Sequence, residues 1–353
     1  LADDMRLTLG GRYSEEDKTG SRVVSVVDLN GVVGPYNTTA FPVTSSASAG
    51  AVYTLGFGID NEQYEGHNLS AKRTESKFTP AANFQWDMND QTMLYASYTE
   101  GFKAGGFDAR SNKNDNFEFD EELAESFELG AKMSLADGAA ELNVALYLTE
   151  YTDLQTSQFD GQLGFNVTNA GEATIQGIEL DGRWQLTDAL YLTGAIGFLD
   201  FEFDEFEGSQ CYFGEVSDSP STAGLCDRTG DTREFAPELT ANLGAAYMIE
   251  VSDDIGLTLG LDMSYSDEYF VSPTLDPNLQ QDSYVKFNGR VALESAENIW
   301  SVALLVENIT DEEISTFGNE APLAGTATAQ GGTAYYSFYE APRNVALKVR
   351  YNF

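Results

Sequence analysis

The chain has few residues of the kinds that usually carry out chemistry. His67 is the single histidine, and Cys211 and Cys226 are the two cysteines. The sequence contains no histidine pair for a metal, no cysteine–histidine arrangement for nucleophilic catalysis, and no Gly-rich phosphate loop at a strand-to-helix junction. Pairs of carboxylates arise by chance in so acidic a chain and do not indicate a hydrolase. We therefore expect a protein that is not an enzyme and that has no cofactor and no resident metal.

The two cysteines lie in one polar segment. Fourteen residues separate Cys211 from Cys226, and the segment is rich in Gly, Ser, Asp and Pro. A disulfide that closes this segment would suit an oxidising compartment such as the periplasm or the cell surface. The other interpretation is two unrelated free thiols. We favour the disulfide, because both cysteines share one loop and nothing resembling a metal site accompanies them.

Aromatic and polar side chains in the expected loops are the candidates for contact with a solute. A ring offers a large contact area at a small entropic cost, and a hydroxyl group fixes orientation. The other interpretation is that these side chains only pack the loops together. The acidic run Asp311-Glu312-Glu313 could hold Ca²⁺, although solvated carboxylates are the simpler interpretation. The candidates for solute contact are Tyr36, Tyr53, Tyr64, His67, Phe102, Phe107, Tyr212, Phe213, Tyr269, Phe270, Tyr335, Tyr336 and Tyr339.

The chain is strongly acidic, with 57 Asp and Glu against 19 Lys and Arg and a formal net charge of −38. Such a charge repels phosphate backbones, which excludes nucleic acid as a partner. Acidity by itself can indicate disorder, but 42% hydrophobic and 12% aromatic residues argue against disorder here. The acidic surface is interpreted either as an aid to solubility in salty surroundings or as a vestibule that attracts cations, and the first interpretation is the simpler one.

The elements that must position these residues are β-strands. Apolar and polar residues alternate from Val345 to Phe353, so a strand separates them onto two faces, whereas a helix would scatter them. Similar alternation recurs along the chain, which predicts about twelve strands. The upstream segments are 7–13, 79–87, 92–100, 127–135, 142–148, 178–184, 190–198, 239–247, 257–265, 285–293 and 300–306.

The connections between these strands are of two kinds that alternate strictly. An up-and-down membrane barrel has this arrangement, with short turns on the periplasmic side and long loops outside. The short connections have hairpin-turn residues and are Asn89-Asp90, Ala136-Asp137-Gly138, Thr187-Asp188, Ser252-Asp253-Asp254 and Ala296-Glu297-Asn298. The long, polar connections are about 14–74, 101–122, 150–172, 200–236, 267–283 and 308–342.

The hydropathy of the chain is compatible with a membrane barrel. There is no apolar run of about 18 residues, so no transmembrane helix is expected. The mean hydropathy of −0.29 would usually indicate a soluble protein, but in a barrel only alternate residues face lipid. The chain starts at Leu1 without a basic leader, so we expect it to follow processing or to lie within a longer protein. Aromatic residues near strand ends would form interfacial girdles: Tyr13, Trp86, Trp184, Tyr247, Tyr265, Trp300 and Tyr351.

Five segments carry a resemblance to a known family. They are 5–13 (MRLTLGGRY), 92–107 (TMLYASYTEGFKAGGF), 122–130 (ELAESFELG), 169–180 (NAGEATIQGIEL) and 306–311 (VENITD), and the chain ends in the aromatic Phe353. In this order they resemble barrel strands of the TonB-dependent receptors of bacterial outer membranes. The resemblance extends over nearly the whole chain. It implies an all-β fold, an antiparallel transmembrane β-barrel.

Members of that family have a 22-stranded barrel preceded by a plug domain and a segment that contacts TonB. The resemblance therefore implies that residues 1–353 are the C-terminal portion of such a barrel, with its last twelve or so strands. The plug and the earlier strands have no counterpart in this chain. The terminal Phe353 resembles the signal that the barrel-assembly machinery reads, although it is also one more lipid-facing residue on an alternating strand.

The resemblance implies active import of a scarce extracellular solute across a Gram-negative outer membrane, most often of a ferric siderophore or another iron complex. Its implied partners are outer-membrane lipid, the small-molecule solute, the TonB complex through the plug, and the barrel-assembly machinery through the last strand. Three alternatives stay open: a complete small passive porin or channel, a barrel that acts as a surface receptor or adhesin, and a soluble secreted β-protein.

Overall fold

Twelve long strands form a single antiparallel sheet in which each strand pairs with its neighbours in chain order. The computed structural model describes residues 2–24, 67–110, 117–159, 165–169, 171–217, 225–321 and 332–353. The strand number and order confirm the prediction from alternation. The strands are β1 (Met5–Val24), β2 (His67–Asn89), β3 (Thr92–Lys103), β6 (Glu122–Leu135), β7 (Ala140–Thr152), β10 (Glu172–Gln185), β11 (Leu190–Glu205), β14 (Leu239–Ser252), β15 (Ile255–Ser266), β18 (Tyr284–Ser295), β19 (Trp300–Glu307) and β22 (Asn344–Tyr351).

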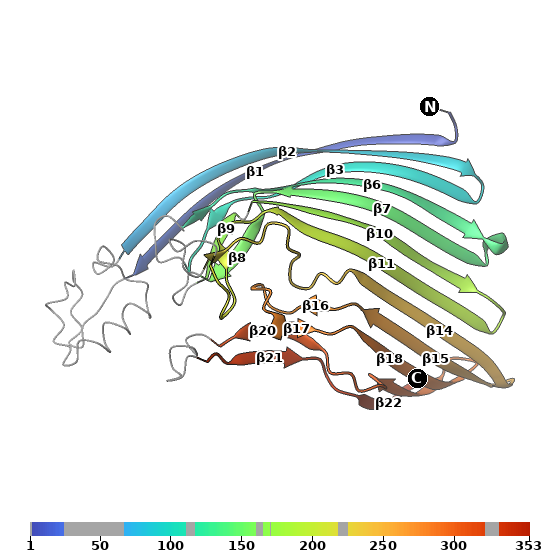
Figure 1. Ribbon diagram of the computed structural model, residues 1–353. Coiled ribbons are helices and arrows are strands. Elements are labelled where there is room, and N and C mark those ends of the chain that lie inside the picture. Colours follow the sequence, from blue (N-terminus) through green and yellow to red (C-terminus); the bar gives the residue numbers. More distant parts are fainter. Residues whose placement is uncertain are drawn as a thin grey trace.

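The sheet curls into an open trough, with tight turns at one end and long connections at the other (Figure 1). β1 and β22 are its two edges, and in the described part of the chain neither pairs with a further strand. All five expected turns join neighbouring strands; one of them, η3 (Ala136–Gly138), is a 3₁₀ turn. In the part of the chain that the structure describes, no helix has the length and apolar character to cross a membrane.

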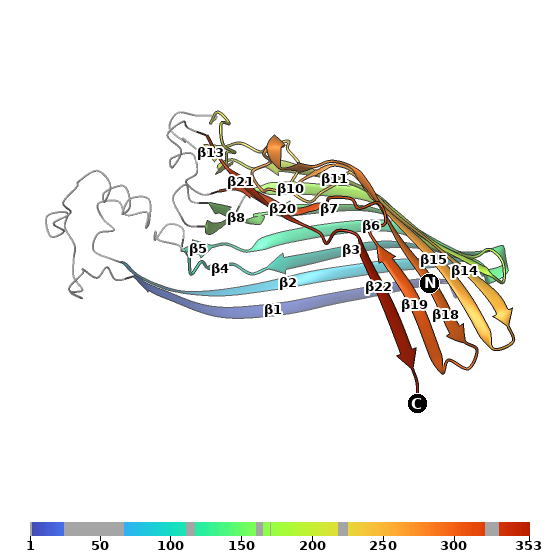
Figure 2. The same cartoon turned by 90° about the horizontal axis from the view of Figure 1, so that it is seen from below.

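The long connections carry small two-stranded sheets of their own, which gather at the loop end (Figure 2). The sequence indicated only polar loops in these places, because pairs this short have too few residues to show alternation. They are β4 (Gly106–Phe107) with β5 (Glu118–Phe119), β8 (Gln155–Phe159) with β9 (Phe165–Asn169), β12 (Ser209–Gln210) with β13 (Leu225–Cys226), β16 (Tyr269–Phe270) with β17 (Gln280–Gln281), and β20 (Ser315–Glu320) with β21 (Tyr335–Tyr339).

One face of the sheet carries large apolar side chains that are exposed. Leu129 is 59% exposed and Leu347 is 69% exposed. A continuous exposed surface of this kind is stable against lipid and unstable in water. The opposite face is polar; there Arg183 bonds to Glu141 at 2.6 Å across the β7–β10 pair. The alternation predicted both faces, and the backbone groups of the inner strands pair with the neighbouring strands on either side, as a lipid environment requires.

Aromatic side chains mark the turn end of the lipid-facing surface. Trp184, Tyr247 and Tyr351 are exposed near the tight turns, and Trp300 lies directly opposite Tyr351 in the β19–β22 pair. Rings of this amphipathic kind collect at the boundary between lipid and water. The positions agree with the expected aromatic girdle.

The first connection is shorter than the sequence indicated. The expected loop at 14–74 is wrong at both ends, because β1 continues to Val24 and β2 begins at His67 in unbroken register. A transmembrane strand needs only about 9–11 residues, so the 20 residues of β1 extend well beyond a bilayer. Both faces are polar there, and alternation no longer reveals the strand. Charged contacts stabilise this part, such as Lys18 Nζ to Glu16 at 3.0 Å.

Candidate functional site

The polar face of the sheet becomes apolar at the loop end. Along β11, Ile196 and Phe198 lie on the lipid-facing side and are more than two-fifths exposed. Phe201 and Phe203 lie an odd number of residues beyond Phe198 or Ile196, and successive side chains of a strand alternate between its faces. They therefore point to the other face, where they are buried. The apolar residues of this strand therefore change faces near Leu199, where the strand leaves the lipid band.

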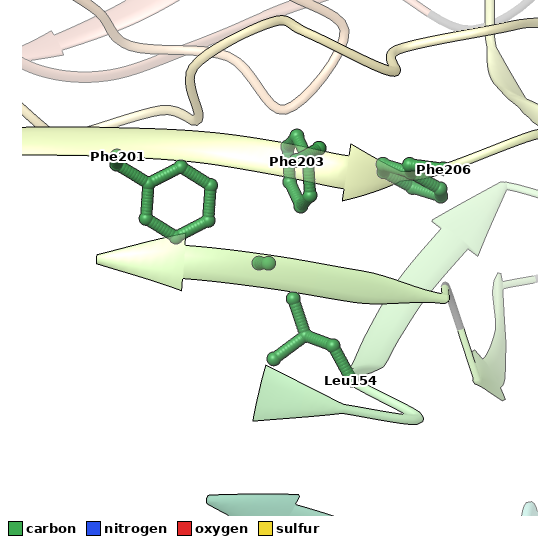
Figure 3. Close-up of a cluster of buried hydrophobic side chains, with 5 residues drawn as sticks. Leu154, Phe201, Phe203 and Phe206 are labelled. Atoms are coloured by element: carbon green, nitrogen blue, oxygen red, sulfur yellow. The ribbon is translucent and has the colours of Figure 1, made fainter. Parts of the chain in front are cut away.

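The buried rings form a small hydrophobic cluster (Figure 3). Phe203 lies 4.9 Å from Phe201 and 4.7 Å from Phe206 between ring centroids. Leu154 and Ala173 complete the cluster from the β7–β10 connection and from β10. Close aromatic pairs contribute about 0.5–1.5 kcal/mol each beyond the area they bury. The cluster thus gives the loop end a rigid base.

A cavity of about 470 Å³ lies beside this cluster. Its wall combines apolar rings with hydrogen-bonding groups, which is the usual composition of a small-molecule site. The wall comes from four long connections that are far apart in the sequence. Lining side chains are Leu154, Gln155, Thr156, Ser157, Phe203, Phe206, Ser209, Gln210, Arg228, Arg233, Glu234, Phe235, Pro273, Thr274, Leu275, Phe317, Asn319 and Tyr336.

Arg228 joins two of these connections, 200–236 and 267–283, from a buried position. Its guanidinium donates to the Glu215 carboxylate at 2.8 and 2.6 Å and to the Thr274 carbonyl oxygen at 2.9 Å. A second carboxylate, Asp231, lies 3.6 Å away. Burial raises the pKa of Asp231 above its ordinary value, and Arg228 opposes that rise. Since its charge is already balanced, Arg228 acts as a structural cross-link of the cavity wall.

Arg233 is the cation of the cavity wall that is open to solvent. Its guanidinium carbon lies 5.5 Å from the centroid of the Phe201 ring, a cation–π distance. Its ion pair with Glu234, at 3.3 Å, is partly exposed. An incoming anionic group can therefore compete for Arg233 more easily than for Arg228.

In the described part of the chain, three further hollows lie on the two faces of the sheet. One of about 620 Å³ is on the polar face of β15, β18 and β19, beside the 308–342 connection, where Lys286 and Glu340 pair at 2.7 Å. The other two are shallow grooves between apolar side chains such as Leu129 and Leu180 on the lipid-facing surface. Lipid would fill those grooves, so the loop-end cavity is the better candidate for a solute site.

Comparison with known proteins identifies the family. Residues 1–309 match the family model described as TonB dependent receptor-like, beta-barrel. The chain belongs to this family. TonB-dependent receptors are outer-membrane β-barrels of Gram-negative bacteria that act as receptors and transporters rather than as enzymes.

Relatives of this receptor barrel include two curated proteins. The ferric-pyoverdine M114 receptor PbuA of Pseudomonas sp. (strain M114) is 25% identical over 299 residues, which is 83% of this chain and 32% of that receptor. The probable TonB-dependent siderophore receptor PiuA of Acinetobacter baumannii is 26% identical over 203 residues, 54% of this chain and 27% of the relative. The chain thus spans about a third or less of the length of these relatives.

Solved structures show the same fold. The ferric yersiniabactin uptake receptor FyuA of Yersinia pestis superposes with a TM-score of 0.64 at 17% identity, over 82% of this chain and 40% of that chain. The siderophore receptor PiuA of Acinetobacter baumannii has a TM-score of 0.60 at 18% identity, over 99% of this chain and 54% of that chain. Both confirm the barrel architecture.

Of the thirteen solute candidates, only Tyr336 lines the cavity of this receptor barrel among the residues that the structure describes. Tyr36, Tyr53 and Tyr64 lie outside the described residues. His67 is the first residue of β2, and its side chain is also outside the described part. No statement about solute contact follows for these four positions.

Several other candidates pack loops together. Phe107 stacks on Phe117 with ring centroids 5.2 Å apart, and Phe102 pairs with Leu123 near the end of β3. Burial raises the pKa of Tyr269 to about 12, and its hydroxyl donates to the Ser315 carbonyl oxygen at 3.4 Å. These contacts correspond to the packing interpretation that the sequence left open.

The remaining described candidates do not line the cavity, although some of them adjoin residues that do. Tyr212 and exposed Phe213 follow the first cysteine, and Phe270 accepts a backbone hydrogen bond from Phe235, which does line the wall. Tyr335 and Tyr339 stand on β21 with Tyr336. Sequence reasoning missed Phe203, Phe206, Phe317 and both arginines. Near Leu199 the apolar residues of β11 switch to the other face of the strand, and this switch in the sequence could have revealed Phe203.

The two cysteines form a disulfide that holds β12 and β13 together, with a Cα–Cα distance of 5.1 Å. Glu215 lies within 4.8 Å of both sulfurs. Sulfurs in a disulfide are not thiolates, and Glu215 is already bound to Arg228, so this group is not a metal centre. In the acidic run, Asp311 pairs with Arg343 at 3.4 Å.

Proposed function

We propose that the chain is the barrel portion of a receptor that imports a ferric siderophore, and that the loop-end cavity forms part of the solute site. The observation that carries this proposal is the cavity wall itself, which combines the rings of Phe203, Phe317 and Tyr336 with the accessible cation of Arg233. A ferric chelate has apolar or aromatic arms around an oxygen-rich and often anionic centre. Rings bind the arms, and a guanidinium binds a carboxylate or another anionic oxygen.

The relatives support iron as the cargo. PbuA is described as a ferric-pyoverdine receptor, PiuA as a siderophore receptor and FyuA as a ferric yersiniabactin uptake receptor. Two of these names refer to different siderophores, so they support the class of solute and not one compound. The passive-porin alternative has no support from a family of TonB-dependent receptors.

We further propose that residues 1–353 supply the last twelve strands of a 22-stranded barrel. In that arrangement β1 and β22 would pair with strands contributed by further sequence, and a plug ahead of this chain would contact TonB. The barrel-assembly machinery would read the terminal strand. Its last side chain, Phe353, is fully exposed and lies 5.0 Å from the Tyr351 ring, so it is accessible to such a partner.

Binding by the detergent-purified full natural chain tests the solute site. A panel of ferric siderophores would be titrated while intrinsic fluorescence is followed, with wild type compared with Arg233→Ala and with the control Arg183→Ala. Arg183 is also exposed and ion-paired, but it lies on the turn half of β10. Loss of a hydrogen bond to a charged group costs about 1.5–3 kcal/mol, so affinity should fall about tenfold or more for Arg233→Ala alone. Equal affinities in both variants, with at least one siderophore bound by wild type, would refute the role of this cavity. Failure of wild type to bind any ferric complex would refute the solute class.

A further inference from the structure

Two carboxyl groups meet without a cation beside the cavity. Asp276 is fully buried at the start of the 3₁₀ turn η5 (Pro277–Leu279), and Glu320 is the last residue of β20. Among the described residues, no lysine or arginine forms an ion pair with either carboxylate. The nearest arginine, Arg228, is already bound to Glu215 and to the Thr274 carbonyl oxygen.

The backbone brings the two groups together through a connected set of contacts. Gly318 N donates to the Val271 carbonyl oxygen at 2.9 Å, so β20 lies along the segment that contains Asp276. Glu320 pairs directly with Tyr335 across the β20–β21 hairpin. The Tyr335 hydroxyl accepts a hydrogen bond at 3.3 Å from Asn278 Nδ2, which also donates to Asp276 Oδ1 at 2.9 Å.

One oxygen of each carboxylate is held by a backbone N–H. Asp276 Oδ1 accepts from the N–H of Asn278 at 2.8 Å, whereas Asp276 Oδ2 is buried and has no hydrogen-bond partner in the described part of the chain. Glu320 Oε1 accepts from the N–H of Phe213 at 2.6 Å. Donors that fix one oxygen of a carboxylate orient the other, as the outer partners of metal ligands do.

An unpartnered buried carboxylate oxygen beside a second carboxylate is costly unless a positive charge compensates it. Burial raises the pKa of Glu320 above its ordinary value; the Phe213 N–H opposes this rise, and nearby Asp276 adds to it. A cation or a shared proton could supply the compensation. The donors are all oxygens, with no histidine or thiolate among them, and such a set suits a hard cation.

We propose that the carboxylates of Asp276 and Glu320 together bind a Ca²⁺ ion. Water would complete the coordination shell, because Glu320 is partly open to solvent and Ca²⁺ accepts six to eight oxygens in an irregular geometry. With only two protein carboxylates, the site belongs with the weak extracellular class, whose dissociation constants are about 10⁻⁴–10⁻³ M.

The bound ion would join three segments at the rim of the cavity. Glu320 brings the β20–β21 hairpin, Asp276 brings the 271–279 segment, and the Phe213 N–H that holds Glu320 brings the disulfide-bonded loop. Thr274, Asn319 and Tyr336 of these segments line the cavity. Calcium therefore stabilises the cavity wall, whatever solute the receptor imports.

Calcium binding to the full natural chain in detergent tests the proposal. The protein would be stripped of divalent ions and titrated with Ca²⁺ by calorimetry, with Tb³⁺ luminescence as a second readout. Asp276→Asn and Glu320→Gln each remove one charged ligand and keep the side-chain shape. Glu313→Gln is the control, since Glu313 is an exposed carboxylate in the connection that leads to the same hairpin. Heat-modifiable migration on gels verifies that each barrel is folded.

The expected result is one saturable Ca²⁺ site that weakens about tenfold or more in Asp276→Asn and in Glu320→Gln and is unchanged in Glu313→Gln, because even the loss of an outer partner costs about 10–100-fold. Calcium should also slow proteolysis of the β20–β21 hairpin. Wild type without saturable binding, or equal binding by all variants, overturns the proposal. Protection of the hairpin by acid and not by Ca²⁺ also overturns it, because a shared proton then replaces the ion. None of these readouts requires siderophore binding, so this proposal and the proposed function can fail separately.

Discussion

Replacement of Arg228 by Met removes the buried cation that cross-links the cavity wall and keeps a side chain of similar length. Arg228 is 7% exposed and donates three hydrogen bonds of 2.6–2.9 Å, two to Glu215 and one to Thr274. Glu215 would keep its negative charge in a site where 18% of its side chain is exposed. The variant therefore leaves a largely desolvated carboxylate and a carbonyl oxygen without their donor.

The cost follows from that geometry. Breaking a buried ion pair by removing one partner costs about 3–5 kcal/mol, mainly because the other charge stays buried and unpaired. Glu215 regains some solvent contact, so the lower value of about 3 kcal/mol applies, which is about 100-fold in the equilibrium between the closed and open loops. The barrel strands should be unaffected, since this contact joins only loop segments.

Hydrogen exchange followed by mass spectrometry measures this opening. Peptides covering 206–217 and 225–231 should exchange about 100-fold faster in Arg228→Met. Arg343→Met is the control; its ion pair with Asp311 is 3.4 Å long and about half exposed, so the expected change is below about 1 kcal/mol. If Arg228→Met changes exchange no more than this control does, the cross-link argument is wrong. The double variant Arg228→Met/Glu215→Gln should recover part of the loss, because the unpaired charge is gone.

Three further predictions concern pH, redox state and lipid. Burial alone would raise the pKa of Asp108, but the Arg110 side chain and the N–H groups of Arg110 and Val167 hold it below its ordinary value. The ionised carboxylate therefore contributes stability above the unfolded pKa of about 3.9. That stability is lost as the pH falls through the lower pKa of the folded state. The protection factor of the Val167 amide, which is its exchange corrected for the intrinsic rate at each pH, should thus fall in acid in wild type and be less pH-dependent in Asp108→Asn. The Cys211–Cys226 disulfide closes a loop with a sequence separation of 15, and its reduction should destabilise this loop by about 3 kcal/mol. Proteolysis of the loop should then be faster, whereas the heat-modifiable migration of the barrel should be unchanged. Leu129→Arg, on the lipid-facing side, should destabilise the barrel by up to about 2–4 kcal/mol, as measured by denaturant titration. Lys132→Ala, on the polar side, should have a much smaller effect. Equal effects of the two variants would contradict the assignment of faces.

Much of the barrel could be predicted from local sequence. The side chains of a strand alternate between two faces, so Val345 to Phe353 already separates a lipid-facing row from a polar row. The hairpin turns also follow from local chemistry, because Asn, Asp and Gly adopt the required backbone angles; Asp137 and Gly138 both have positive φ in the structure. Neither feature needs information from distant residues.

The ends of the first hairpin could not be predicted in this way. From Ser14 to Arg22 the strand extends beyond the lipid band, and its residues are mostly polar on both faces. Its strand structure depends on pairing with β2, including the contact of Asp17 with Thr74. A pattern of apolar residues cannot report pairing that polar groups provide.

The sequence by itself determined the strand number, the orientation of the faces and the family, because each rests on local periodicity or on ordered motifs. Only the tertiary structure decided which loop residues meet. It placed Arg233 over Phe201, put Tyr336 alone of the described candidates in the cavity wall, and brought Asp276 to Glu320. The cavity is built by connections separated by tens of residues, and their relative positions depend on the curvature of the sheet and on buried contacts such as those of Arg228. No local pattern encodes those distances.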